Sequence, residues 1–153
     1  MRKLTIICAI FAFALASAPT ARGAPVHDFN EAVATAYGFY REAYFLLGDG
    51  NAQVASLELE EMADRWTSIV ERFGSTPPDV YSTDPTWKKT LEAIGTRIAR
   101  GLRAAIEGDA KAAKKALGPI RELLSDLRRR NGVVVYSDCI NQANAAFAKL
   151  YKF

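Results

Sequence analysis

The chain has 153 residues, of which 50% are hydrophobic and 24% are charged, with 10 Gly, 6 Pro and 2 Cys. This is the length and composition of one globular domain. It excludes a disordered tail, a collagen-like fibre and a small disulfide-rich domain, because the compositions of these classes are far more biased.

The first segment predicts export. Met1–Lys3 is basic, and Leu4–Ala18 is an uncharged apolar run of 15 residues followed by small residues. This is the arrangement of a secretory signal peptide, and the run is shorter than the ~20 residues that a membrane-spanning helix needs. We expect a cleaved leader at residues 1–23 and one domain at residues 24–153, without a membrane span and in a periplasmic or secreted location. An uncleaved membrane anchor is the alternative.

Removing the leader changes the charge of the chain. The chain has 20 Lys and Arg against 17 Asp and Glu, and Arg2, Lys3 and Arg22 belong to the leader. The remainder is neutral overall, so it lacks the basic excess that nucleic-acid binding requires. Its net charge is nevertheless −8 over residues 24–87 and +8 over residues 88–153. Either the two halves neutralise each other, or the molecule has an acidic and a basic face that would steer a partner.

Hydrophobic spacing predicts helices along the rest of the chain. Apolar residues recur at intervals of three and four in Phe29–Leu47, Ala55–Phe73, Trp87–Ala105 and Asp109 to about Arg130. Asp84 followed by Pro85 predicts the start of the third of these helices. We expect Gly118–Pro119 to kink the fourth helix, because proline removes a hydrogen-bond donor and crowds the preceding turn.

The last part of the chain predicts a connector and one more helix. Val133–Tyr136 is expected to be extended, and Ser137 or Asp138 is expected to cap the helix that follows. The residues that this helix should turn inward are Ile140, Ala143, Phe147 and Leu150 or Tyr151.

The predicted fold class is therefore all-α. Short connections favour antiparallel neighbours, so we expect an up-and-down bundle of four main helices plus the C-terminal helix. Gly48–Asp49 and Gly108–Asp109 lie 60 residues apart, as do Leu57 and Leu117. This spacing fits either an internal repeat of two helical hairpins or coincidence.

Few side chains beyond the leader carry catalytic or metal chemistry. There is one His (His27), one Cys (Cys139) and one Met (Met62). A structural zinc site needs four Cys- or His-type ligands, a Glu-x-x-His di-iron bundle needs two histidines, and covalent haem needs Cys-x-x-Cys-His. We therefore expect a protein that acts by binding and has no catalytic residues.

A candidate cation site lies in the second predicted helix. Glu58, Glu61 and Asp64 would hold a hard cation such as Ca²⁺ only if another segment added oxygen ligands. The alternative is a solvated acidic face.

Cys139 has two interpretations. It is either a small buried residue packed under the connector, or a reactive or intermolecularly paired thiol, as an odd cysteine in an oxidising compartment often is.

Basic residues of the second half form the candidate partner-binding surface. Its expected members are Arg97, Arg100, Arg103, Arg121, Arg128, Tyr136, Asp138 and Cys139. The partner we expect is another protein of the cell envelope, met through this basic half and the connector. The run Arg128–Arg130 has a structural alternative, because cations near a helix C-terminus complement its dipole.

Aromatic residues crowd the first helix at Tyr37, Phe39, Tyr40, Tyr44 and Phe45. They fall on more than one face, so we expect either burial in a five-helix core or a seam with a second copy of the chain.

An exported helical bundle with Trp66 in its second helix and Cys139 near its last resembles the cytochrome c′/cytochrome b562 group of periplasmic four-helix haem proteins. The resemblance covers the bundle region and rests on layout, because Tyr136-Ser137-Asp138-Cys139-Ile140 replaces the Cys-x-x-Cys-His signature. It implies an alternative function in electron transfer or gas binding, with haem or a divalent metal as cofactor. A non-covalent haem would lie between Met62 and His27, which do not match the group's axial pattern. The resemblance therefore implies a haem-less relative.

Overall fold

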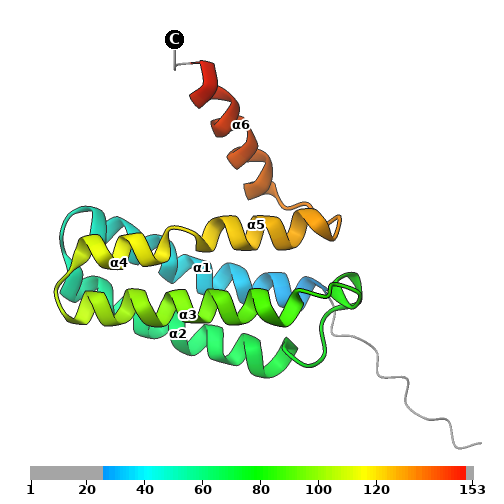
Figure 1. Ribbon diagram of the computed structural model, residues 1–153, viewed down its shortest axis with the longest axis horizontal. Coiled ribbons are helices and arrows are strands. Elements are labelled where there is room, and N and C mark those ends of the chain that lie inside the picture. Colours follow the sequence, from blue (N-terminus) through cyan, green and yellow to red (C-terminus); the bar gives the residue numbers. More distant parts are fainter. Residues whose placement is uncertain (1–25, 151–153) are drawn as a thin grey trace, which may run out of the picture.

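The computed structural model describes residues 26–150, and these contain helices and no strand. The elements in chain order are α1 (Val26–Gly48), α2 (Ala52–Phe73), the 3-10 turn η1 (Asp79–Tyr81), α3 (Trp87–Ile106), α4 (Ala110–Leu117), α5 (Ile120–Arg130) and α6 (Tyr136–Leu150) (Figure 1). The predicted all-helical class is confirmed for this part of the chain. The predicted leader at residues 1–23 and Tyr151 lie outside the described residues. Within residues 26–150, no helix combines the length and apolar character that crossing a membrane requires.

The first four long elements form two helical hairpins whose corners have the same construction. Gly50 and Gly108 have positive φ angles of 79° and 82°, which favour glycine because a Cβ would be strained there. The amides of the next residues, Asn51 and Asp109, donate to the carbonyls five residues earlier at 2.9 and 2.8 Å. The side chains of Asn51 and Asp109 then accept hydrogen bonds from the amides three residues later. Each corner therefore combines a Schellman end with an N-cap, which turns the chain back on itself.

These corners place the two hairpins in a common register of 58 residues, the separation of Gly50 and Gly108. Buried positions of the first hairpin recur, 58 residues later, as buried positions of the second. The matched pairs are Phe29 and Trp87, Val33 and Leu91, Ala36 and Ile94, Tyr40 and Ile98, Ala43 and Gly101, Leu47 and Ala105, Ala55 and Ala113, Leu59 and Leu117, Met62 and Ile120, Trp66 and Leu124, and Ile69 and Leu127. The predicted 60-residue register is wrong, because Leu57 is exposed whereas Leu59 and Leu117 are fully buried.

Gly101 of α3 lies where this helix closely approaches α4. A Cβ added there would lie 2.7 Å from Cδ2 and 2.8 Å from Cγ of Leu117. At Gly95 of the same helix, an added Cβ would lie 3.4 Å from the nearest atom of Trp66, an ordinary contact. Gly101 is therefore needed for the close approach of α3 and α4, whereas Gly95 has room for a Cβ beside Trp66 of α2.

We therefore expect Gly101→Ala and Gly95→Ala to have opposite effects. Both substitutions gain up to ~1 kcal/mol of helix propensity, but overpacking against Leu117 should cost about 1–3 kcal/mol at position 101. Chemical denaturation of the two variants should show Gly95→Ala as the more stable. Equal stability would mean that Leu117 moves aside without cost.

The predicted interruption at Gly118–Pro119 is confirmed, but it divides the segment from Asp109 to Arg130 into two helices instead of kinking one. α4 ends at Leu117 and α5 begins at Ile120. Pro119 has no N–H to donate to the preceding turn, so the helical hydrogen bonds stop at the Gly118 amide, which donates to the Lys114 carbonyl at 3.0 Å. The two helices are offset from one another at this break (Figure 1).

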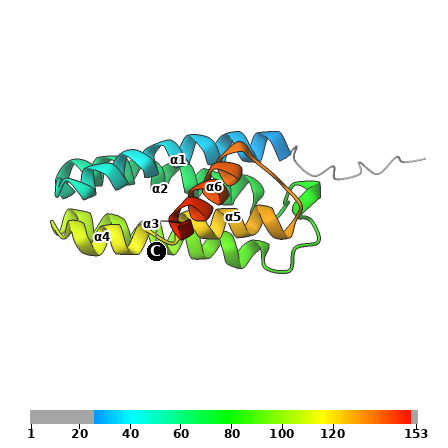
Figure 2. The ribbon, with the colours of Figure 1, turned by 90° about the horizontal axis from the view of Figure 1, so that it is seen from above.

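The prediction that the last helix packs into the bundle is wrong. Residues 133–135 form the expected connector, but α6 begins at Tyr136 and projects away from the other helices (Figure 1). Seen from above, it therefore lies in front of them (Figure 2). α6 begins before Ser137 and Asp138, so neither residue caps it, and the carboxylate of Asp138 accepts hydrogen bonds from Arg128 instead. Exposed residues on the stripe expected to face inward are Ile140 (42%), Ala143, Phe147 (58%) and Leu150 (67%).

Candidate partner-binding groove

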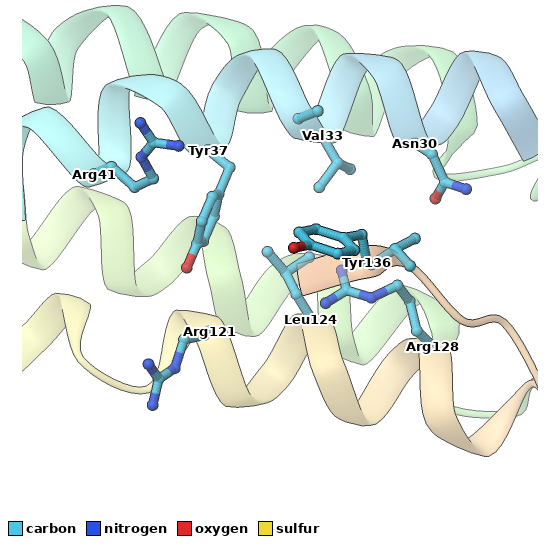
Figure 3. A pocket seen from close by; sticks show the side chains of 10 residues that line it. Asn30, Val33, Tyr37, Arg41, Arg121, Leu124, Arg128 and Tyr136 are labelled. Carbon is cyan, nitrogen blue, oxygen red and sulfur yellow. The ribbon is translucent and has the colours of Figure 1, made fainter. Parts of the chain in front are cut away.

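A groove of about 380 Å³ lies between α1 and α5, with the connector and the start of α6 as its third wall (Figure 3). It is lined by Asn30, Val33, Ala34, Tyr37 and Arg41 of α1, by Arg121, Leu124 and Arg128 of α5, and by Val135 and Tyr136. The ring of Tyr37 and the side chain of Leu124 point into the space between α1 and α5 (Figure 3). The groove therefore combines apolar and aromatic surface with guanidinium groups.

A second cavity of about 300 Å³ extends this groove along α1. It shares Tyr37, Arg41 and Arg121 with the first cavity and adds Tyr40, Tyr44 and Gly118. Gly118 belongs to the break between α4 and α5, so this break borders the extension. From Asn30 to Tyr44 the combined groove spans about 21 Å at the rise of an α-helix.

Three tyrosines form one wall of the groove. The ring centroids of Tyr37 and Tyr40 are 4.8 Å apart, those of Tyr40 and Tyr44 are 5.5 Å apart, and both pairs are stacked. Their spacing of three and four residues places them in one row on the helix. Burial raises the pKa of Tyr37 and of Tyr40 above the usual tyrosine value, so both phenols are neutral at physiological pH. The row offers flat, uncharged surface on which a ring or an aliphatic chain can stack.

Cationic side chains follow the same row. Lys114 Nζ lies 4.8 Å from the centroid of the Tyr44 ring, a cation–π contact at one end of the groove. Arg121 has only its exposed neighbour Glu122, at 3.6 Å, as an ion-pair partner. Within residues 26–150, neither Arg41 nor Lys114 forms a salt bridge. Within residues 26–150, the unpaired positive charge along the groove is therefore that of Arg41 in the groove lining and of Lys114 beside Tyr44.

Arg128 has a different role from the other arginines of the groove. Its Nε and Nη2 donate to the two carboxylate oxygens of Asp138 at 2.7 and 2.6 Å, and both side chains are almost buried. The hydrogen bonds from Arg128 hold the pKa of Asp138 below its usual value. This bidentate pair fixes the start of α6 against α5 and so positions Tyr136 at the mouth of the groove.

The structure brings together three of the eight predicted partner-binding residues. Arg121, Arg128 and Tyr136 all line the groove. Asp138 supports its wall through Arg128. Cys139 is exposed on α6, so its interpretation as a buried residue is wrong.

Arg97, Arg100 and Arg103 lie on α3 and do not line the groove. Sequence reasoning did not select Tyr37 or Arg41 as site residues. The available signal was the row of tyrosines on α1 with Arg41 beside it, but without α5 this row has no opposite wall.

Close ion pairs between the two oppositely charged halves of the chain are few among the described residues. Among the salt bridges of the described residues, only that of Arg130 with Asp84 joins residues 24–87 to residues 88–153. The remaining pairs lie within one half. The acidic side chains of α2 and the basic side chains of α3 to α5 thus remain available to solvent and to partners.

The residues considered for a metal or haem are not assembled into a site. No group of three or more metal-binding side chains occurs in residues 26–150, so Glu58, Glu61 and Asp64 gain no further ligand there. Met62 is buried in the core at 1% exposure, whereas the His27 side chain is 83% exposed beside Glu31. The groove lining contains no imidazole or sulfur ligand.

The chain matches no known protein family, no curated protein and no solved structure.

Proposed function

We propose that this is an exported binding protein of the cell envelope without catalytic activity, built as an up-and-down helical bundle behind a cleaved leader. Its partner is another envelope protein that places an acidic segment in the groove between α1 and α5. The observation that carries the proposal is the row of stacked tyrosines flanked by cations, two of which, Arg41 and Lys114, form no ion pair within residues 26–150.

The shape of the groove favours a protein segment over a compact ligand. At ~3.3 Å per residue, an extended chain of about six residues would cover the ~21 Å between Asn30 and Tyr44. Its carboxylates would meet Arg41 and Arg121, and its alternate apolar side chains would pack on Tyr37 and Leu124. Arginine suits this role because its planar guanidinium binds a carboxylate through two parallel hydrogen bonds.

A fluorescein-labelled peptide that alternates glutamate with phenylalanine provides the test. We expect it to bind the full chain, and we expect Arg41→Glu with Arg121→Glu to weaken binding by at least about tenfold, which is 1.4 kcal/mol. The matched control is Arg100→Glu with Arg103→Glu, which changes the net charge equally but on a helix that does not line the groove. Fluorescence anisotropy at low and high salt measures how tightly the peptide binds the parent and each of the two double variants.

The control variant also decides between surfaces. Equal weakening by both charge reversals would contradict the groove and indicate non-specific attraction to the basic half. Weakening by the α3 reversal alone would assign the partner to Arg100 and Arg103. A peptide in which lysine replaces glutamate should not bind, because the groove cations would repel it.

A further inference from the structure

One of the three arginines in the groove is already bound by a carboxylate of the chain itself. Arg41, Arg121 and Arg128 all line the groove. In the described part of the chain Arg41 forms no salt bridge, and Arg121 has only an exposed neighbour as its partner. Arg128, by contrast, donates from Nε and Nη2 to both carboxylate oxygens of Asp138 at 2.7 and 2.6 Å. The edge of this guanidinium that suits an acidic ligand is therefore occupied.

The segment that carries Asp138 has the same kinds of side chain as the ligand proposed for the groove. Val135 and Tyr136 line the groove, and Asp138 follows two residues later. Figure 3 shows the ring of Tyr136 among the other groove side chains. Within four residues the chain thus supplies an aliphatic group, an aromatic ring and a carboxylate. An acidic segment with alternate apolar residues would present the same groups to the same surface.

The buried attachment of α6 is the side chain of Asp138. Among the α6 residues whose exposure the structure describes, Asp138 is buried at 7% exposure and all the others are exposed, Tyr136 at 81%. The helix leads away from the rest of the molecule beyond this point (Figure 1). Breaking the contact between Asp138 and Arg128 would therefore release the start of α6 while the core stays covered.

We propose that Asp138 is an internal competitor of the partner: a partner carboxylate that binds Arg128 displaces Asp138 and frees Val135 and Tyr136 from the groove. This inference rests on the proposed function, because it requires an acidic segment that binds in the groove. A carboxylate on so short a tether has an effective concentration on the order of millimolar. A single carboxylate would compete poorly with it, whereas a segment that also binds Arg41 and Arg121 gains the contacts needed to displace it. The competitor therefore selects for partners with several acidic residues.

The first test removes the competing charge. In the full chain, Asp138→Asn should bind the fluorescein-labelled glutamate–phenylalanine peptide about three- to tenfold more tightly than the parent does. The reason is that the apparent dissociation constant is the intrinsic one divided by the fraction of molecules in which the site is free. Asp126→Asn is the matched control, because it removes the same charge from α5 at an exposed pair outside the groove. An Asp138→Asn variant that binds no more tightly than this control would overturn the competition.

The second test leaves Asp138 in place. Cys139 is exposed and lies next to Asp138, so a nitroxide attached to it in a Cys8→Ser chain reports the motion of the start of α6. We expect saturating peptide to narrow the electron paramagnetic resonance lines of this label. An unchanged spectrum, with peptide binding shown by anisotropy, would overturn the displacement of Asp138 and leave the groove as the binding site. Peptide binding to neither the parent nor Asp138→Asn would instead contradict the proposed function on which the competition rests.

Discussion

Phe29→Ala should lower the free energy of unfolding by about 3–5 kcal/mol. Phe29 is 1% exposed and lies at the centre of an aromatic cluster at the end of the bundle. Its ring centroid is 5.4 Å from that of Phe73, 5.5 Å from that of Tyr81 and 5.0 Å from that of Trp87. The substitution would leave a cavity among three large rings that come from α2, η1 and α3 and cannot easily close it.

Tyr81→Phe is the control for this prediction. Tyr81 is fully buried, and its hydroxyl has no hydrogen-bond partner among the described residues. Removing that hydroxyl keeps the packing and removes an unsatisfied polar group, so stability should stay the same or rise by ~1 kcal/mol. Urea denaturation measures both variants. A large loss for Tyr81→Phe would show that the hydroxyl has a partner, and a loss below ~1 kcal/mol for Phe29→Ala would contradict the cluster's role.

Asp84→Asn should cost about 2 kcal/mol at neutral pH. Asp84 and Pro85 predict the start of α3, but that helix begins at Trp87, and the Asp84 carboxylate instead joins two distant segments. Arg130 and Asn131, at the end of α5, both donate to Oδ2 at 2.8 Å, and the Thr86 amide donates to Oδ1 at 2.8 Å. The Asp84 side chain is only 2% exposed, so water cannot replace these donors well.

The same contacts predict how stability changes with pH. Burial raises the pKa of Asp84, but the hydrogen bonds from Asn131, Thr86 and Arg130 outweigh it and lower the pKa to about 2. The pKa in the unfolded chain is about 3.9, so the contribution is fully present above that pH and is lost as the pH falls towards 2. The stability difference between the parent and Asp84→Asn should therefore shrink between pH 5 and about 2.

Asp126→Asn provides the comparison, because Asp126 pairs with Arg129 on an exposed part of α5. Exposed pairs contribute only ~0–1 kcal/mol, so this variant should follow the parent at every pH. The link between α3 and α5 would not depend on a charged Asp84 if the difference in unfolding free energy between the parent and Asp84→Asn stayed constant down to pH 2.

Local sequence rules determined the helices and most of the core. Residues such as Phe29, Trp66 and Leu91 recur at the period of a helix, and all three are buried as their positions predict. The hairpin corners were also readable as turns, because glycine next to Asn or Asp both ends one helix and caps the next. Both patterns involve residues that are close together in the sequence. They can therefore be recognised without knowing which helices pack against each other.

Tertiary packing decided what local signals could not. The groove exists because α5 lies opposite the tyrosines of α1, which gives Arg41 and Arg121 a common site although they are distant in sequence. The exposure of Cys139 follows from α6 leaving the bundle, and the pairing of Asp138 with Arg128 shows which face holds that helix. An amphipathic stripe predicts that one face of a helix will be covered, but it does not say by which surface. That depends on how the helices pack together, which periodicity within one helix does not determine.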